Sequence, residues 1–68
     1  MTQNERVMRY ICEFGSISSW EAFRDLGITR LAARIADIER DGIQFSRQRE
    51  ATTNRYGEKT YYTRYSLK

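Results

Sequence analysis

The chain has 68 residues, of which 12 are Lys or Arg and 9 are Asp or Glu, so its net charge is +3. A chain this short is expected to form one domain (residues 1–68) that buries about 60% of its unfolded surface, too little for a deep substrate cavity. No apolar run exceeds three residues, and the amino terminus lacks the pattern of a secretion signal. We therefore expect a cytoplasmic protein with no membrane partner.

The residue inventory argues against catalysis. The chain has no histidine, one cysteine and no phosphate-binding glycine loop, so acid–base, zinc and nucleotide chemistry lack the residues they need. We predict a protein that is not an enzyme and has no cofactor, metal or small-molecule substrate. Cys12 follows Ile11 in an expected helix, which predicts a half-buried thiol without a chemical role. Residues 43–68 hold six basic and two acidic side chains and account for the positive surplus.

The first expected helix begins at a capping box. Thr2 and Glu5 have the required spacing, although Asn4 could cap a slightly shorter helix, and Gly15 ends the helix. The apolar residues that follow at spacings of three and four predict one buried face: Val7, Tyr10, Ile11 and Phe14.

A second capping box, Ser18 with Glu21, opens the next helix, Ser19 to Leu26. Ser16-Ile17-Ser18 before it is a short extended connector, from which Ile17 could join a small sheet. The inner face of the second helix is predicted to hold Ala22, Phe23 and Leu26. Trp20 is expected to cover the edge of the core, and a base-stacking role for it is the alternative.

Gly27 closes the second helix, and Thr29 is expected to cap the third across a short turn that Ile28 fills. Within the third helix a buried stripe is predicted at Leu31, Ile35 and Ile38. That stripe leaves Arg30, Ala33, Asp37 and Arg40 pointing outward, with Arg34 at the margin. Small residues on the outer side, Ala33 and Ala36, would let the helix approach another surface closely.

After Gly42 the pattern becomes that of strands. Alternation begins at Ile43, and Asn54 and Gly57 occupy the first and fourth positions of a predicted type I turn. A β-hairpin follows, whose inner end should pack on the helices through Phe45, Tyr65 and Leu67, with Tyr61 expected to join this core cluster.

Three sequence segments carry a family resemblance: Ser16 to Phe23, Leu26 to Ile35 and Asn54 to Lys59. Together they resemble the small helix-turn-helix domain proteins of phages and prophages of Gram-positive bacteria, and the likeness covers almost the whole chain. The resemblance implies an α+β fold, a winged helix-turn-helix with three helices followed by a C-terminal hairpin wing. It also implies a sequence-specific double-stranded DNA-binding protein, such as a transcriptional regulator, in a bacterial cytoplasm or nucleoid.

On this interpretation the third helix enters the major groove. Arg30 and Arg34 could each donate two bonds to a guanine, beside Ala33 and Asp37 on the same helix, and Thr29 could bind a phosphate. The hairpin would reach the flanking backbone or the minor groove. Its candidates are the basic residues and the residues of the turn: Arg47, Arg49, Asn54, Arg55, Tyr56 and Lys59. Arg64 would add non-specific attraction.

Several alternatives stay open at the sequence level. Arg30 and Arg34 could be merely solvated, and Arg47, Arg49 and Arg64 could instead protect a strand edge from aggregation. The domain could dock on a protein through its aromatic hairpin, assist phage recombination or, less favoured, bind RNA. A single domain of this size usually binds DNA modestly, so a homodimer on a paired site is expected.

Overall fold

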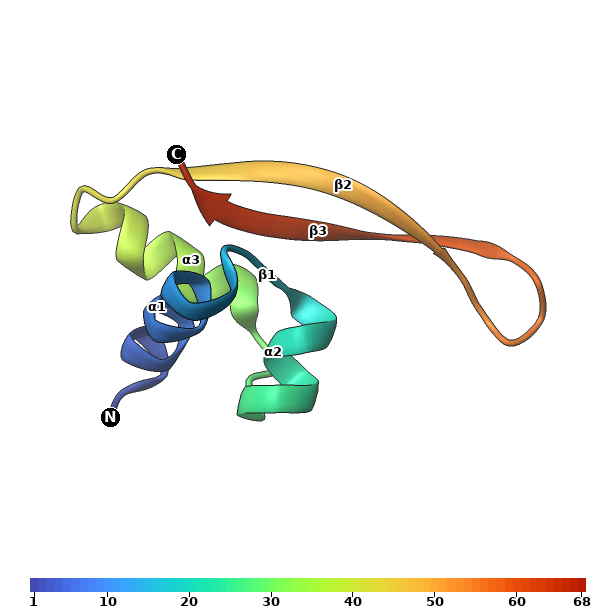
Figure 1. The fold of residues 1–68 in the computed structure, drawn as a ribbon, viewed down its shortest axis with the longest axis horizontal. Coiled ribbons are helices and arrows are strands. Elements are labelled where there is room, and N and C mark those ends of the chain that lie inside the picture. The colour runs from blue at the N-terminus through green and yellow to red at the C-terminus, as the bar shows by residue number, and fades with distance from the viewer.

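Three helices and three strands follow one another in the computed structural model, which describes residues 1–68. In chain order they are α1 (Gln3–Phe14), β1 (Ile17–Ser18), α2 (Ser19–Leu26), α3 (Leu31–Arg40), β2 (Phe45–Thr53) and β3 (Lys59–Leu67). The helices gather at one end, and the hairpin of β2 and β3 crosses above them and projects well beyond α2 (Figure 1). The long axis therefore measures 39 Å against 22 and 20 Å for the other two. None of the three helices combines the length and apolar character needed to cross a bilayer.

Both predicted capping boxes are confirmed. Thr2 Oγ1 accepts a bond from the Glu5 amide at 3.1 Å, while Glu5 Oε1 accepts one from the Thr2 amide at 3.2 Å. Ser18 and Glu21 make the same reciprocal pair at the start of α2, at 3.2 and 3.0 Å. These bonds satisfy amides that the first turn of a helix leaves without partners, so the helix starts are fixed locally.

The sheet has the order β1-β3-β2 and is antiparallel throughout. The connector predicted to offer Ile17 forms a two-residue strand, in which Ile17 pairs with Tyr65 and Ser18 with Arg64. Beyond that last pair the hairpin is a two-stranded ribbon. We call the whole hairpin the wing and residues 49–63, which lie beyond β1, the outer wing.

The core lies between the helices and the base of the wing. Eleven apolar residues are buried there: Val7, Tyr10, Ile11, Ile17, Ala22, Ile28, Leu31, Ile35, Ile38, Phe45 and Tyr65. The predicted stripe of α3 is confirmed in full, since Leu31, Ile35 and Ile38 are all at most 4% exposed. Every element except the outer wing contributes to this core.

Two predictions about the buried helix faces were wrong. Phe14 is 67% exposed because it is the last residue of α1, where its ring only packs beside that of Tyr10, with 4.7 Å between centroids. Phe23 is 55% exposed because Ala22 and Leu26 turn α2 toward the core and leave Phe23 on the outside. Cys12, predicted half-buried, is exposed.

The predicted hairpin cluster was only partly correct. Phe45 and Tyr65 are buried, but Tyr61 is 55% exposed because it lies on the outer wing, where no helix covers it. Leu67 is 43% exposed because it is the last residue of β3 and β1 does not extend alongside it. Alternation identified the correct side of the ribbon, but not how far the helices cover it.

Candidate nucleic-acid interface

The turn between α2 and α3 is built from one glycine and one buried isoleucine. Gly27 takes the left-handed conformation (φ 68°) and donates its amide to the Phe23 carbonyl at 3.1 Å. Ile28 then enters the core, with 1% of its surface exposed. These two residues reverse the chain and set the start of α3, as the sequence predicts.

The expected cap of α3 was wrong. The N-cap is Arg30, one residue later than Thr29, and no side chain bonds to the first amides of the helix. The reason is that helical bonding begins at Arg30, whose carbonyl accepts the bond from the Arg34 amide at 3.3 Å, while Thr29 stays exposed in the turn. The amino end of α3 therefore presents uncapped backbone N–H groups beside an exposed arginine, which suits an anion.

The outer face of α3 carries small side chains. Ala36 is exposed as predicted, but Ala33 is half-buried. Ala32, which was not predicted to face outward, is exposed instead. Arg30 is exposed, and Arg34 is half-buried, with 31% of its side chain accessible. The wing begins beside the carboxyl end of α3 and projects beyond α2 (Figure 1).

Three charged residues of α3, Arg34, Asp37 and Arg40, are paired with one another. Asp37 lies within ion-pair distance of Arg34, at 3.2 Å, and also pairs with Arg40. Arg34 additionally donates to Gln3 Oε1 at 3.1 Å, while its buried Nε has no partner. Asp37 is therefore compensated, and Arg34 would exchange existing bonds for any new ligand.

The base of the wing is fixed to the end of α3 by a two-bond ion pair. Arg47 donates to the two carboxylate oxygens of Glu39 at 2.7 and 3.0 Å and lies over the ring of Tyr65. This hydrogen bonding lowers the pKa of the Glu39 carboxyl and raises the pKa of Arg47. The charge of Glu39 is thus neutralised by Arg47.

The outer wing carries cations with no acidic partner. The guanidinium of Arg49 lies 4.3 Å from the centre of the Tyr61 ring, a cation–π contact that fixes its direction. Arg55 and Lys59 are exposed near the tip and take part in no ion pair. These three side chains can meet a phosphate without first losing an internal partner.

The tip itself is organised by Asn54. Its Oδ1 accepts bonds from the amides of Tyr56 (2.9 Å) and Glu58 (3.0 Å), and its carbonyl accepts one from Gly57 at 3.1 Å. This last bond closes a turn with asparagine first and glycine fourth, as predicted. Asn54 therefore shapes the tip, while Tyr56 is left 79% exposed.

A comparison with family models matches residues 2–68 to a model described as "Winged helix-turn-helix domain". The chain belongs to this family. Winged helix-turn-helix domains typically bind DNA and are generally not catalytic, and DNA is accordingly the kind of partner that membership implies. No curated protein and no solved structure gave a significant match.

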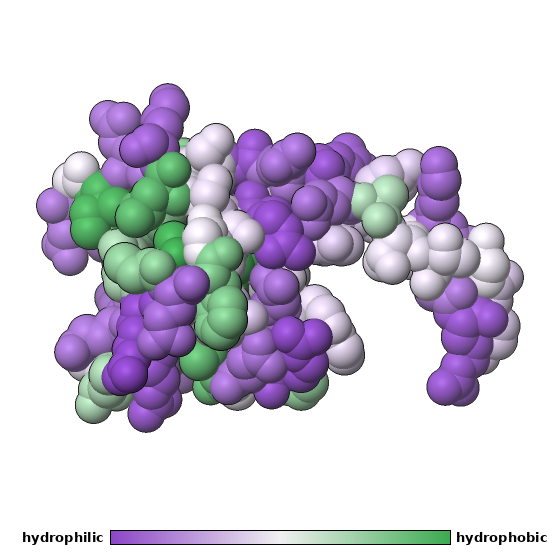
Figure 2. Space-filling model, viewed as in Figure 1, coloured by the Kyte–Doolittle hydropathy of each residue, from purple (hydrophilic) through white to green (hydrophobic).

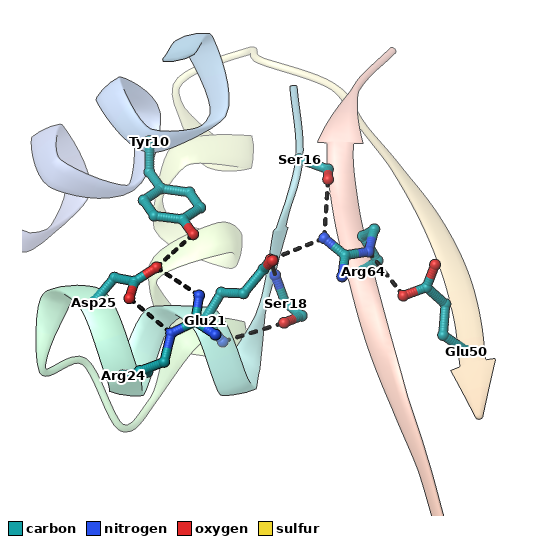
Figure 3. Close-up of polar contacts among 8 residues, drawn as sticks. All are labelled: Tyr10, Ser16, Ser18, Glu21, Arg24, Asp25, Glu50 and Arg64. Carbon is teal, nitrogen blue, oxygen red and sulfur yellow. Dashed lines mark hydrogen bonds and ion pairs between the residues drawn. The ribbon is translucent and has the colours of Figure 1, made fainter. Parts of the chain in front are cut away.

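Two polar clusters hold α2 in this winged helix-turn-helix domain (Figure 3). One joins α2 to α1 and the other joins it to the wing. Tyr10 donates to Asp25 at 2.6 Å, and Arg24 donates to both oxygens of that carboxylate. The bonds from Arg24, and next those from Tyr10, lower the pKa of Asp25 to about 2. The bond to Asp25 also raises the pKa of Tyr10.

The second cluster shows that the expectation for Arg64 was wrong. Its Nη1 donates to Glu21 at 2.8 Å and to Ser16 at 3.0 Å, and its Nε donates to Glu50 at 2.8 Å (Figure 3). These bonds raise the pKa of Arg64 and lower that of Glu50. Arg64 therefore joins the wing to α2 and is not a free phosphate ligand.

Sequence reasoning also missed a site. Trp20 and Tyr61 line a cleft between α2 and the wing, although one was placed at the edge of the core and the other inside it. The signal that could have revealed them is the position of Tyr61 in the third strand pair from the tip of the hairpin, too far from the core-forming base to be covered. No group of three or more His, Cys, Asp or Glu side chains is placed to hold a metal ion.

Proposed function

We propose that this domain is a sequence-specific double-stranded DNA-binding protein of the phage or prophage type, acting as a transcriptional regulator. The observation that carries the proposal is the placement of its unpaired cations. Six of the twelve basic side chains form no ion pair. Four of these six lie in the turn before α3 or on the outer wing: Arg30, Arg49, Arg55 and Lys59.

In this proposal α3 enters the major groove with its amino end foremost. The exposed alanines Ala32 and Ala36 allow close approach, and the uncapped amides can bind a phosphate with Thr29. Arg30 is the first candidate for a guanine edge because it has no internal partner, and Arg34 is the second because it must leave Asp37. Ala33 and Asp37 complete the contacting face.

The outer wing would then grip the flanking backbone or the minor groove. Arg55 and Lys59 supply the charge at the tip, Asn54 holds the turn and exposed Tyr56 can pack on a sugar. Arg49 extends the same basic surface inward, while Arg47 contributes less because Glu39 already holds it. The wing would thus provide most of the sequence-independent attraction.

The proposal extends to how the protein works in the cell. The chain would act as one unit in the cytoplasm or nucleoid of a bacterial host. Because a single module of this kind buries roughly 600–1,000 Å² on DNA, two copies on a paired site would give useful affinity. An accessory role in phage recombination would use the same DNA-binding surface.

The test is a titration of a labelled random duplex at two salt concentrations. Wild type should bind at low salt and weaken steeply as salt rises, because bound phosphates release counterions. Replacing Arg55 and Lys59 together by Gln should weaken binding to all sequences and reduce the salt slope by about 2. The matched control replaces Arg6 and Lys68 by Gln. These two residues are also unpaired but lie on α1 and at the carboxyl end, so the control should change the salt slope far less. Absence of duplex binding at low salt would refute the proposal and favour a protein-docking module.

A further inference from the structure

A cleft of about 390 Å³ lies between α2 and the wing. One wall is formed by α2 and the other by the two wing strands. The side chains that define the walls are Trp20, Arg24, Thr52, Thr60, Tyr61 and Tyr62. The outer wing stands clear of the helical body on this side, so the cleft is open to a ligand (Figure 2).

The cleft is unusually rich in accessible aromatic surface for a domain this small. Trp20 is 61% exposed and Tyr61 is 55% exposed, and neither belongs to the buried core. Trp20 has no ring or guanidinium stacked on it, whereas one face of the Tyr61 ring is covered by Arg49. Flat aromatic faces of this kind stack on nucleic acid bases whatever their identity, because every base has a π face.

The walls are held in place before any ligand arrives. Arg64 fastens β3 to α2 through Glu21, and Arg24 is fixed by Asp25 on the helix itself (Figure 3). Asp25 is thereby compensated by Arg24, and Glu21 shares the charge of Arg64 with Glu50, so both carboxylates repel a phosphate chain less than free ones would. A cleft with preformed walls loses little conformational freedom when it binds.

The charge around the cleft favours a nucleic acid strand over an apolar peptide. Arg49 and Lys59 are unpaired and lie with Tyr61 on the face of the two-stranded ribbon opposite to Thr60 and Tyr62, because side chains alternate along a strand. A strand whose base enters the cleft would place its phosphates beside these cations where it crosses the ribbon. A base that remains paired presents only its edge, so stacking requires an unpaired base.

We infer that the cleft between α2 and the wing binds an unpaired base of single-stranded DNA, stacked on Trp20, with the adjoining phosphates held by the outer wing. This goes beyond the proposed binding of duplex DNA, and the two activities can fail separately. It would let the same protein recognise a melted or forked segment beside its duplex site.

The experiment uses the intrinsic fluorescence of Trp20, the only tryptophan of the chain. An oligothymidine of about ten nucleotides should quench this emission, whereas an abasic strand of equal length and charge should not. By anisotropy of a labelled strand, Trp20→Ala should weaken binding roughly 5- to 100-fold and Trp20→Phe much less, as expected for loss or retention of one stacked base. Phe23→Ala is the matched control, since Phe23 is an exposed aromatic of the same helix that does not line the cleft, and it should leave affinity unchanged.

Several results would overturn the inference. They are equal quenching by the abasic strand, unchanged affinity in Trp20→Ala, or quenching by a short apolar peptide with none by the strand. Normal duplex binding in the salt titration alongside any of these would leave the proposed function intact. Loss of duplex binding together with base-dependent quenching would refute the proposed function and leave this inference intact. The protein would then be a single-strand binder.

Discussion

α3 and the outer wing both present arginines, but their charges are compensated differently. Arg34 and Arg40 of α3 share the carboxylate of Asp37, whereas Arg55 and Lys59 of the outer wing have no acidic partner. A paired cation exchanges one interaction for another when it binds a phosphate, and an unpaired cation only gains one. On the proposed function, this difference would leave shape recognition mainly to α3 and electrostatic attraction mainly to the wing.

The two regions also differ in how they are held. α3 buries three large side chains in the core, while no residue of the outer wing is buried. The outer wing keeps its form through strand pairing and the turn around Asn54. A rigid helix can fix a register on DNA, and a ribbon fixed only at its base can adjust to the flanking strand.

The largest expected effect comes from removing part of the support of α3. Ile35→Ala should reduce the free energy of unfolding by about 2–5 kcal/mol, because Ile35 is fully buried and the loss leaves a cavity. Thr53→Ala on the exposed outer wing should change it by less than about 0.5 kcal/mol. Urea unfolding followed by circular dichroism measures both. Equal losses in the two variants would show that the wing is as integral to the core as α3.

The parts of the fold that could be predicted are those that local signals determine. The capping boxes at Thr2 and Ser18 use residues three apart, and Gly27 marks a left-handed position that other residues adopt at a cost. The stripe of α3 follows from a period of 3.6 residues within one helix. None of these inferences needs to know what lies on the other side of the molecule.

The parts that could not be predicted depend on distant pairings. Arg64 meets Glu21 from 43 positions away, and Arg47 meets Glu39 only because the hairpin base returns to the end of α3. A sequence shows that these arginines are basic but not that they are already bound. The prediction that Tyr61 joins the core was wrong for the same reason. Alternation shows on which side of a strand a residue lies, but not how far the helices cover that side.

A middle-sized effect should follow when the wing is disconnected from α2. Arg64→Met keeps an unbranched stem but removes three hydrogen bonds, so we expect a loss of about 1–2 kcal/mol in unfolding free energy. Amides of the outer wing should also exchange faster with solvent, which hydrogen exchange by NMR would detect. Arg40→Met is the control, because that mostly exposed side chain pairs only with Asp37, and a loss of no more than about 0.5 kcal/mol is expected. An unchanged exchange pattern in Arg64→Met would contradict the role of Arg64 in joining wing and body.

The last prediction concerns acidification, which should change stability least near neutral pH. At low pH it should remove the contrast between paired and unpaired cations. The pKa values of Asp25, Glu39 and Glu50 are lowered by their arginine partners, that of Asp25 from 3.8 to about 2. A carboxyl group whose pKa is lowered in the folded state stabilises the protein at pH values above its unfolded pKa. This stabilisation is lost as the pH falls through the folded pKa, so thermal stability should stay level from pH 7 to about 5 and drop between about 4 and 2. Protonation would also release Arg47 from Glu39, leaving α3 and the wing alike in their uncompensated charge.

Thermal unfolding by circular dichroism across this range, with Asp25→Asn as the comparison, measures the effect. The variant should be less stable than wild type at neutral pH and approach it near pH 2, and parallel curves would exclude Asp25 as a source of the acid response.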